Sequence, residues 1–129
     1  MFTKQERSSF SYWFAHWCSF QMTALNLKVW KPKYLFHDIE KPFLKLIWDY
    51  KKLQKWHRMN NSHHLEYKGK IDVESMIIDW ECSRFTKAEA QMTAIETYEY
   101  FINEKYKGTE TELFLKKEVR PILTKLFKY

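Results

Sequence analysis

The sequence has few of the residues that build turns, with two glycines and three prolines among 129 residues. A β-sandwich needs many turn residues, and collagen-like or glycine-rich linker chains need far more of both types. The aromatic content of 19% excludes a disordered chain, which lacks large apolar side chains. We therefore predict an all-α fold, a single compact bundle of five to six helices over residues 1–129.

Cysteine and long apolar runs are also scarce. Cys18 and Cys82 are too few for a disulfide framework and lack C-x-x-C spacing, so we interpret them as reduced, buried thiols. No apolar run is long enough for a signal peptide or for a membrane span. These absences predict a cytoplasmic protein with no membrane partner.

Acidic residues are fewer than basic ones, 16 against 22, which gives a formal net charge of +6. This excess favours anionic partners. The lysines are scattered over expected helix faces and form no recognised nucleic-acid-binding module, so nucleic acid is the weaker alternative. A small anionic molecule is the expected partner, and the sequence leaves the oligomeric state open.

Apolar periodicity and capping signals predict where the helices lie. The expected helices cover about residues 5–27, 34–41, 43–58, 73–84, 87–106 and 110–127. Pro42 is expected to kink or restart the chain between the second and third helices, and Pro121 to bend the last helix. Asp72 is a good N-cap, and the segments 86–89 and 109–112 have the sequence of capping boxes.

Histidine occurs five times, always in the first half of the chain. The first three histidines, His16, His37 and His57, are 21 and then 20 residues apart, about one helix plus a turn. Each can therefore come from a successive element and point into one bundle interior. Helical bundles build metal sites from such inward side chains, and imidazole and carboxylate are the usual ligands for zinc, iron and manganese.

We therefore predict a metal site built from about residues 16–80. His16, His37, Asp38 and Asp79 are expected to form a four-ligand site for one ion. Adjacent residues of a regular helix diverge by about 100°, but His37 and Asp38 can still straddle one ion placed between them.

A second ion could be held by His57 together with His63 or His64, with Asp38 as the bridge. These two histidines lie in the expected loop at residues 60–64, which is short, polar and rich in turn formers. Two ions about 3.5–4 Å apart can activate a water molecule and clamp a phosphoryl group.

Ordinary structural interpretations stand beside these predictions. His16 lies on an apolar helix face, where a histidine is often a hydrogen-bonded core residue. The pair His63 and His64 could be an exposed turn. Asn60 and Asn61 could contact a ligand or only form that turn.

The segment His37–Lys41 is similar to the H-D-x-x-K motif of the HD-GYP phosphodiesterases, binuclear members of the HD-domain superfamily of metal-dependent phosphohydrolases. His63 and His64 resemble the paired histidines of those enzymes. The chain also resembles a family of small, often phage-encoded proteins with H-D-x-x-K, H-x-x-N-x-x-H-H and D-W elements. Those elements match residues 37–41, 57–64 and 79–80 of this sequence.

The resemblance implies an HD-domain-like helical fold and a metal-dependent phosphohydrolase that acts on a nucleotide or another small phosphoester. It implies one or two divalent transition-metal ions, iron, manganese or zinc, with Lys41 contacting the phosphate or the activated water. Asp38 and Lys41 are the candidate catalytic residues. Lys41, Asn60, Asn61 and His63 are the candidate substrate contacts.

Departures from the family pattern limit what it implies about the substrate. The Gly-Tyr-Pro element of the HD-GYP enzymes is absent, so cyclic di-GMP is not an expected substrate. Two alternatives stay open, an HD-type di-iron oxygenase and a non-enzymatic, phage-type interaction protein in which the metal is structural.

Overall fold

The computed structural model describes residues 1–88 and 91–129, and the elements named in these ranges are all helical. The only pairing of strand type within them is an isolated bridge between Phe2 and Lys87. The predicted all-α class is therefore confirmed. None of the described helices combines the length and the apolar character needed to cross a membrane.

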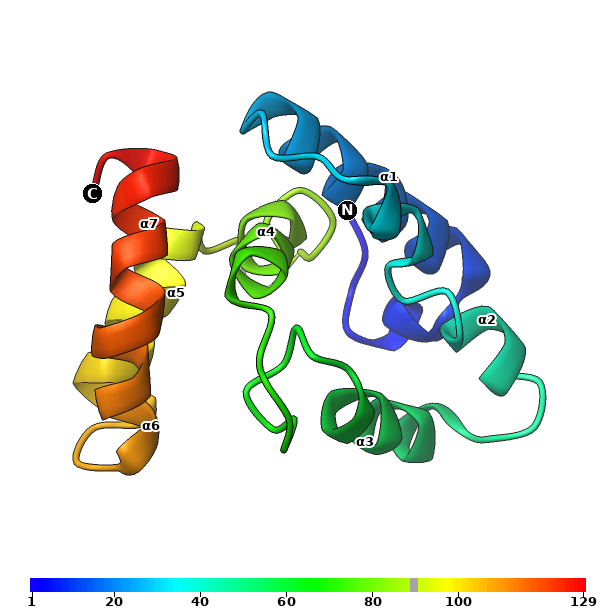
Figure 1. Cartoon of the computed structure of the whole chain (residues 1–129). Coiled ribbons are helices and arrows are strands. Elements are labelled where there is room, and N and C mark those ends of the chain that lie inside the picture. Colours follow the sequence, from blue (N-terminus) through cyan, green and yellow to red (C-terminus); the bar gives the residue numbers. More distant parts are fainter. Residues whose placement is uncertain (89–90) are drawn as a thin grey trace.

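The longest helix, α1 (Phe10–Asn26), packs against α4 (Val73–Ser83), and α4 lies in the middle of the molecule (Figure 1). Between them in sequence come a 3₁₀ turn (Pro32–Phe36), the short α2 (Lys41–Leu44) and α3 (Tyr50–Asn60). Another 3₁₀ turn (Gln5–Ser8) precedes α1.

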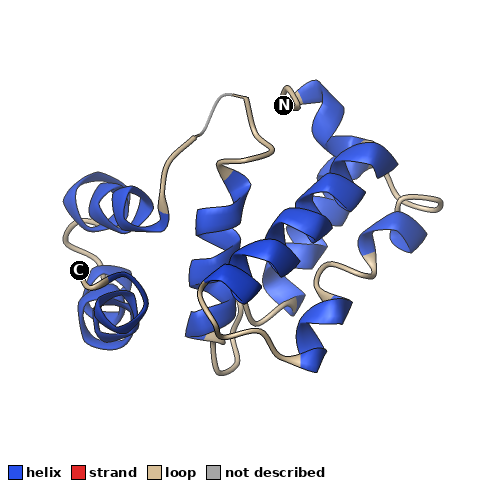
Figure 2. Ribbon diagram, turned by 90° about the horizontal axis from the view of Figure 1, so that it is seen from above, coloured by secondary structure: helices blue, strands red, loops and turns tan. Residues whose placement is uncertain are grey.

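The rest of the chain forms a helical hairpin on the other side of α4, here called the C-terminal hairpin (residues 93–129). Figure 2 shows its two arms side by side when seen from above. Its first arm is α5 (Ala94–Tyr100), continued by a π-helical turn (Phe101–Lys105). Its second arm consists of α6 (Glu110–Phe114), a π-helical turn (Leu115–Val119) and α7 (Arg120–Phe127).

Helix α4 joins two apolar cores, because it carries fully buried side chains on more than one face. Ile78 and Cys82 pack with Phe20, Ala24 and Tyr34 from the α1 side. Met76 and Ile77 belong to the core of the C-terminal hairpin. Its other buried members are apolar residues of both arms: Ala94, Tyr98, Leu115, Val119 and Leu123.

Several helix ends follow from the caps in the sequence. The Asp72 side chain accepts a hydrogen bond from the backbone N–H of Ser75 at 3.2 Å, so its predicted N-cap role is confirmed. Gly108 has a φ of +79°, which suits glycine, and the chain reverses there between the arms of the hairpin. Pro42 lies in the first turn of α2, where its missing N–H costs nothing, so the predicted restart is also confirmed.

Two of the expected helices in the first half are wrong. The helix at 34–41 is replaced by a 3₁₀ turn that ends at Phe36, followed by a turn in which Asp38 has a φ of +54°. The helix at 43–58 is interrupted between α2 and α3, because Asp49 is extended and caps α3 by accepting from the Lys52 N–H at 2.8 Å. The first expected helix, 5–27, begins at Phe10, since Ser9 is extended and caps α1.

The expected helix at 87–106 begins seven residues later, at Ala94. Thr93 and Glu96 form the capping box instead of residues 86–89, of which position 89 lies outside the described residues. The last expected helix, 110–127, is present, with its π-helical turn directly before α7, in whose first turn Pro121 lies. Its capping box is only half formed, because the Glu112 carboxylate accepts from the Gly108 N–H and not from Thr109.

Candidate metal centre

Two groups of potential metal ligands meet in the interior between α1, α3 and α4. One consists of His16, His37, Asp38 and Asp79, and the other of His57, His63 and His64. Within each group, the ligand atoms all lie within 4.8 Å of one another. The fold therefore brings together all seven residues predicted from the sequence as metal ligands.

The first group depends on the packing of α1 against α4. His16, in the middle of α1, places its Nε2 2.9 Å from Oδ1 of Asp79 on α4. His37 Nε2 lies 3.2 Å from the same carboxylate oxygen and 3.1 Å from His16 Nε2. His16 and His37 are buried, and Phe20 stacks on the His37 ring with the ring centroids 3.8 Å apart. Aromatic packing thus holds the imidazole against the carboxylate.

Asp38 is placed by its left-handed backbone conformation, which aspartate tolerates better than most residues. The Trp13 indole N–H donates to the Asp38 carbonyl at 2.8 Å, and the backbone N–H of Lys41 donates to it at 3.1 Å. These contacts hold a tight turn in which the imidazole of His37 and the carboxylate of Asp38 converge, although their positions are adjacent. A regular helix would have separated the two side chains by about 100°.

The carboxylate of Asp38 lies between the two groups. Its Oδ2 is 3.5 Å from His16 Nε2 and 3.3 Å from His37 Nε2. Its Oδ1 is 2.9 Å from His57 Nε2 and 3.1 Å from His63 Nε2. The two oxygens of the Asp38 carboxylate thus face different pairs of histidines.

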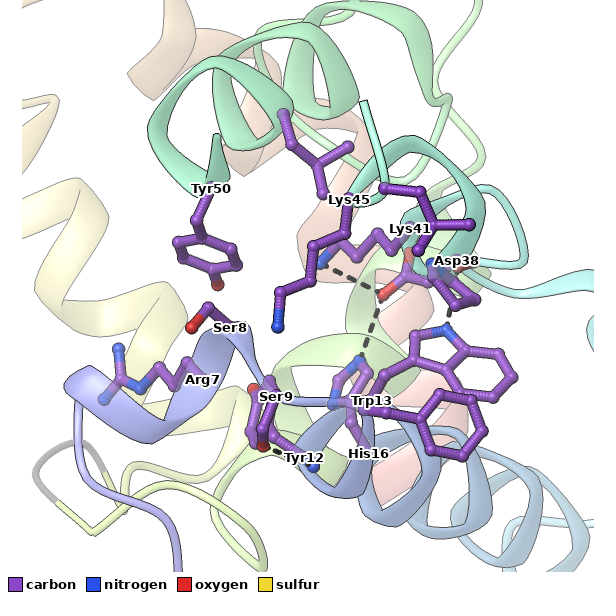
Figure 3. Close-up of a pocket in the computed structure, with 14 residues that line it drawn as sticks. Arg7, Ser8, Ser9, Tyr12, Trp13, His16, Asp38, Lys41, Lys45 and Tyr50 are labelled. Atoms are coloured by element: carbon purple, nitrogen blue, oxygen red, sulfur yellow. Dashed lines mark hydrogen bonds and ion pairs between the residues drawn. The ribbon is translucent and has the colours of Figure 1, made fainter. Parts of the chain in front are cut away.

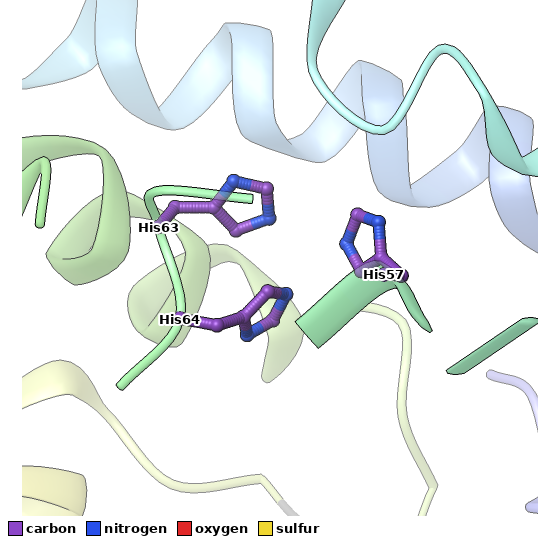
Figure 4. Close-up of side chains that lie close together, drawn as sticks. All are labelled: His57, His63 and His64. Atoms are coloured by element: carbon purple, nitrogen blue, oxygen red, sulfur yellow. The ribbon is translucent and has the colours of Figure 1, made fainter. Parts of the chain in front are cut away.

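The second group comes from the end of α3 and the loop that follows it. Figure 4 shows the rings of His63 and His64, on that loop, turned toward the ring of His57. The Glu40 carboxylate hydrogen-bonds to His57 Nδ1, which leaves Nε2 facing Asp38. Asn61 donates its side-chain amide to Glu40 Oε1 at 3.0 Å and to the His57 carbonyl at 2.9 Å. Such outer partners commonly orient metal-binding histidines.

Four buried ligand atoms test whether a metal fits here: Asp38 Oδ1 and the Nε2 atoms of His57, His63 and His64. None of them has a hydrogen-bond partner of good geometry among the described residues. Buried polar atoms without partners are costly and rare. Carboxylate and imidazole atoms that converge without hydrogen bonding fit a divalent transition metal.

The protonation states also suit a ligand set. Burial lowers the pKa of His37 to about 4 and that of His64 to about 2, so both rings are neutral near pH 7. Burial acts to raise the pKa of Asp79, but the hydrogen bonds with His16 and His37 hold it well below its usual value. The pKa of Asp38 is also held well below its usual value, against burial, by His37 and Lys41.

Two other histidines favour the protonated form. Burial acts to lower the pKa of His16, yet Cys82, Asp38 and Asp79 together raise it well above 6.5. His57 likewise has a raised pKa, because its contacts with Asp38 and Glu40 outweigh burial. A bound metal would displace these protons.

Basic side chains and two cavities adjoin the centre. Lys41 Nζ lies 3.5 Å from Asp38 Oδ2, and Figure 3 shows the amino groups of Lys41 and Lys45 pointing into the larger cavity. A smaller cavity, of about 70 Å³, is lined by His64 and Asp79 and by basic residues: Arg7, Lys41, Arg58 and Lys87. The centre can therefore attract an anion next to its ligands.

The two asparagines predicted as substrate contacts occupy different places. Asn60 is exposed and donates its side-chain amide to the Trp56 carbonyl at 2.9 Å, within α3. Asn61 donates to Glu40 and to the His57 carbonyl, and these contacts help to hold the His57 ring in place.

Sequence reasoning missed Glu40 and Cys82. Cys82 Sγ lies 4.0 Å from His16 Nδ1 and 3.4 Å from the Asp79 carbonyl. The available signals were a carboxylate two residues after Asp38 and a cysteine three residues after Asp79, one helical turn along α4.

Comparisons with protein-family models, with curated proteins and with solved structures found no match to this chain. The function is therefore argued below from the residues and the geometry of this centre.

Proposed function

We propose that the chain is a metal-dependent phosphohydrolase acting on a nucleotide or another small phosphoester. The observation that carries the proposal is the position of Asp38, whose two carboxylate oxygens face different pairs of histidines. A carboxylate in this position can serve two metal ions at once.

The first ion would be held by His16, His37, Asp38 and Asp79, and the second by His57, His63 or His64 and Asp38. Bound divalent ions would supply the activation of water and the neutralisation of phosphate charge. The residues fit iron, manganese or zinc, all of which accept imidazole and carboxylate ligands.

The chain's own residues would bind and orient the phosphate. The Lys41 ammonium group, next to Asp38, and the basic side chains of Arg58 and Lys87 line the small cavity beside Asp79 and His64. They would attract the phosphate and stabilise the negative charge that grows on its oxygens during hydrolysis. Glu40 would keep His57 Nε2 directed at Asp38 by accepting from Nδ1.

This basic lining favours a phosphohydrolase over the two alternatives. A di-iron oxygenase would use the same ligands, but its chemistry does not call for cations around the centre. A purely structural metal would call for neither the cations nor the adjoining cavities.

The test is elemental analysis of the purified protein combined with assays of phosphoester hydrolysis. We expect one or two equivalents of iron, manganese or zinc and measurable hydrolysis, and the loss of both in Asp38→Ala. Glu104→Ala, which removes an exposed carboxylate on the hairpin, is the matched control and should keep both. A metal-free, inactive wild-type protein would overturn the proposal, as would unchanged metal content and hydrolysis in Asp38→Ala.

A chelator separates the alternatives. Loss of hydrolysis with the fold intact supports catalysis, whereas global unfolding of a protein without hydrolytic activity supports a structural metal. Iron with a visible absorption band, together with oxygen uptake on an organic substrate, would support the oxygenase.

A further inference from the structure

Two cavities of different character meet at the edge of the metal centre. The larger has a volume of about 300 Å³ and the smaller about 70 Å³. Six residues line both cavities, and they come from the start of the chain, α1, the turn before α2, α2 itself and α3: Arg7, Tyr12, His16, Asp38, Lys41 and Tyr50. One molecule could therefore occupy both cavities and pass Lys41 on its way.

The smaller cavity suits a single phosphate group. Its basic residues include Lys41, Arg58 and Lys87, and it borders the ligands Asp79 and His64. Its volume of about 70 Å³ is roughly a quarter of that of the larger cavity.

The larger cavity suits an apolar group. Its lining includes Phe10, Trp13, Pro42, Leu46 and Leu53, and its volume is at the lower end of the range for pockets that bind small organic molecules, about 300–1,000 Å³.

Two hydrogen-bonding groups on the Trp13 side of this lining are already engaged. The Trp13 indole N–H donates to the Asp38 carbonyl, and the Ser9 hydroxyl donates to the Glu6 carbonyl at 2.8 Å. A hydrocarbon ring would pack against this side of the cavity without needing a hydrogen bond from either group.

Building on the proposed function, we infer that the substrate is a phosphate monoester with an apolar organic group of one or two rings. The phosphate lies in the small cavity beside Lys41, and the apolar group packs against Trp13 and Phe10 in the large one. In the reaction, water forms a new bond to phosphorus and the bond between phosphorus and the ester oxygen breaks. A proton passes to that oxygen, so the products are an alcohol or phenol and inorganic phosphate.

Binding can be measured apart from turnover with phosphonates, which the enzyme cannot hydrolyse. We expect 1-naphthylmethylphosphonate to bind the as-purified protein at least tenfold more tightly than methylphosphonate, by calorimetry. In zinc-loaded protein, it should also shift the indole N–H signal that Trp13→Phe removes from the NMR spectrum. In the activity arm, 1-naphthyl phosphate should be hydrolysed with a higher kcat/KM than glycerol phosphate or ATP.

Variants at the exposed rim test the apolar cavity without disturbing the core. Phe10 and Leu46 are 62% and 84% exposed, so Phe10→Ser and Leu46→Ser should fold normally. Each should weaken 1-naphthylmethylphosphonate at least fivefold more than methylphosphonate. Leu113→Ser, at a 67% exposed position on α6 that lines neither cavity, is the matched control and should weaken neither.

The two proposals can fail separately. Equal binding of the two phosphonates, or equal weakening of both by the rim variants, overturns the inference even if the protein hydrolyses phosphoesters. Selective binding that moves the Trp13 signal, with no hydrolysis of any phosphoester, overturns the proposed function and leaves the ligand class in place.

Discussion

The N-terminal region, residues 1–83, and the C-terminal hairpin differ in what they bury. Beside the apolar cluster around Phe20 and Ile78, the interior of the first holds buried histidines and carboxylates: His16, His37, Asp38, His57 and His63. The interior of the second is apolar, formed around Tyr98, Leu115, Val119 and Leu123. A buried polar interior is costly unless its groups are paired or bind a metal, whereas apolar burial stabilises the fold directly.

Helix α4 connects the two and explains how they coexist. Met76 and Ile77 pack into the hairpin core, while Asp79 on the same helix contacts His16 and His37. Trp80 also packs toward the hairpin, with its ring edge-to-face on Phe101 and the ring centroids 5.3 Å apart. The apolar core of the hairpin thus holds α4 in place, and α4 in turn positions Asp79 in the candidate metal centre.

The largest effect on stability is expected from the hairpin core. Leu115→Ala should lower the free energy of unfolding by about 2–5 kcal/mol, because it leaves a cavity in a fully buried apolar cluster. Urea unfolding measures the loss, and its exposed neighbour Leu113→Ala is the matched control, with little change expected. Metal content per folded molecule should stay at the wild-type value. A folded Leu115→Ala protein without metal would show that the two regions are not separable.

Removal of a bound metal is expected to destabilise the N-terminal region and not the C-terminal hairpin. Metal at about 100 times its dissociation constant stabilises the folded state by about 2.7 kcal/mol, so chelation should lower the free energy of unfolding by that amount. Hydrogen exchange should rise in α3 and in the loop at 61–72, which carry the second group of histidines, and stay unchanged in α7. An equal rise in α7 would contradict the comparison.

A smaller effect is expected from the outer partner of His57. Glu40→Gln should weaken metal affinity about 10- to 100-fold, because the carboxylate no longer orients the imidazole. Competition with a chelating dye measures the affinity. Glu66→Gln removes an exposed carboxylate 3.5 Å from Arg58 and should leave the affinity unchanged. Equal affinity in Glu40→Gln and wild type would exclude this role.

The smallest change in the free energy of unfolding is expected at Glu74, which lies outside the hairpin core and the candidate metal centre. Its carboxylate contacts the Tyr34 hydroxyl at 2.5 Å and Lys31 Nζ at 2.9 Å, and although burial acts to raise its pKa, these contacts lower it below 4.5. A folded-state pKa below the unfolded value gives stability above pH 4.5 that is lost as the pH falls through the lowered pKa.

Glu74→Gln should therefore cost less than about 1 kcal/mol at neutral pH, since water screens the partly exposed pair. The difference from wild type should disappear well below pH 4.5, as measured by urea unfolding across this range. A difference that grows on acidification would contradict the assigned sign.

The seven candidate ligands could be predicted because histidine is scarce and its first three occurrences are spaced by about one helix. Their partners could not, because Glu40 and Cys82 are ordinary residues in the sequence and acquire a role only when the turn at 37–40 and α4 bring them to His57 and His16. The sequence near α5 could not show where this helix begins, because the segments 86–89 and 93–96 both have the capping-box sequence. Phe2 decides it, by accepting from the Ala88 N–H and donating to the Thr86 carbonyl.

By itself, the sequence determined the helical class, the seven candidate ligands and the excess of basic residues, since composition and spacing are properties of the chain alone. The left-handed backbone conformation of Asp38 depends on the tertiary structure, because Trp13, 25 residues away in the sequence, donates a hydrogen bond to the Asp38 carbonyl. The spacing of apolar residues gives no sign of this conformation. Tertiary structure also decided that Asp38 faces both groups of histidines, because that position requires α1, α3 and α4 to pack around one turn.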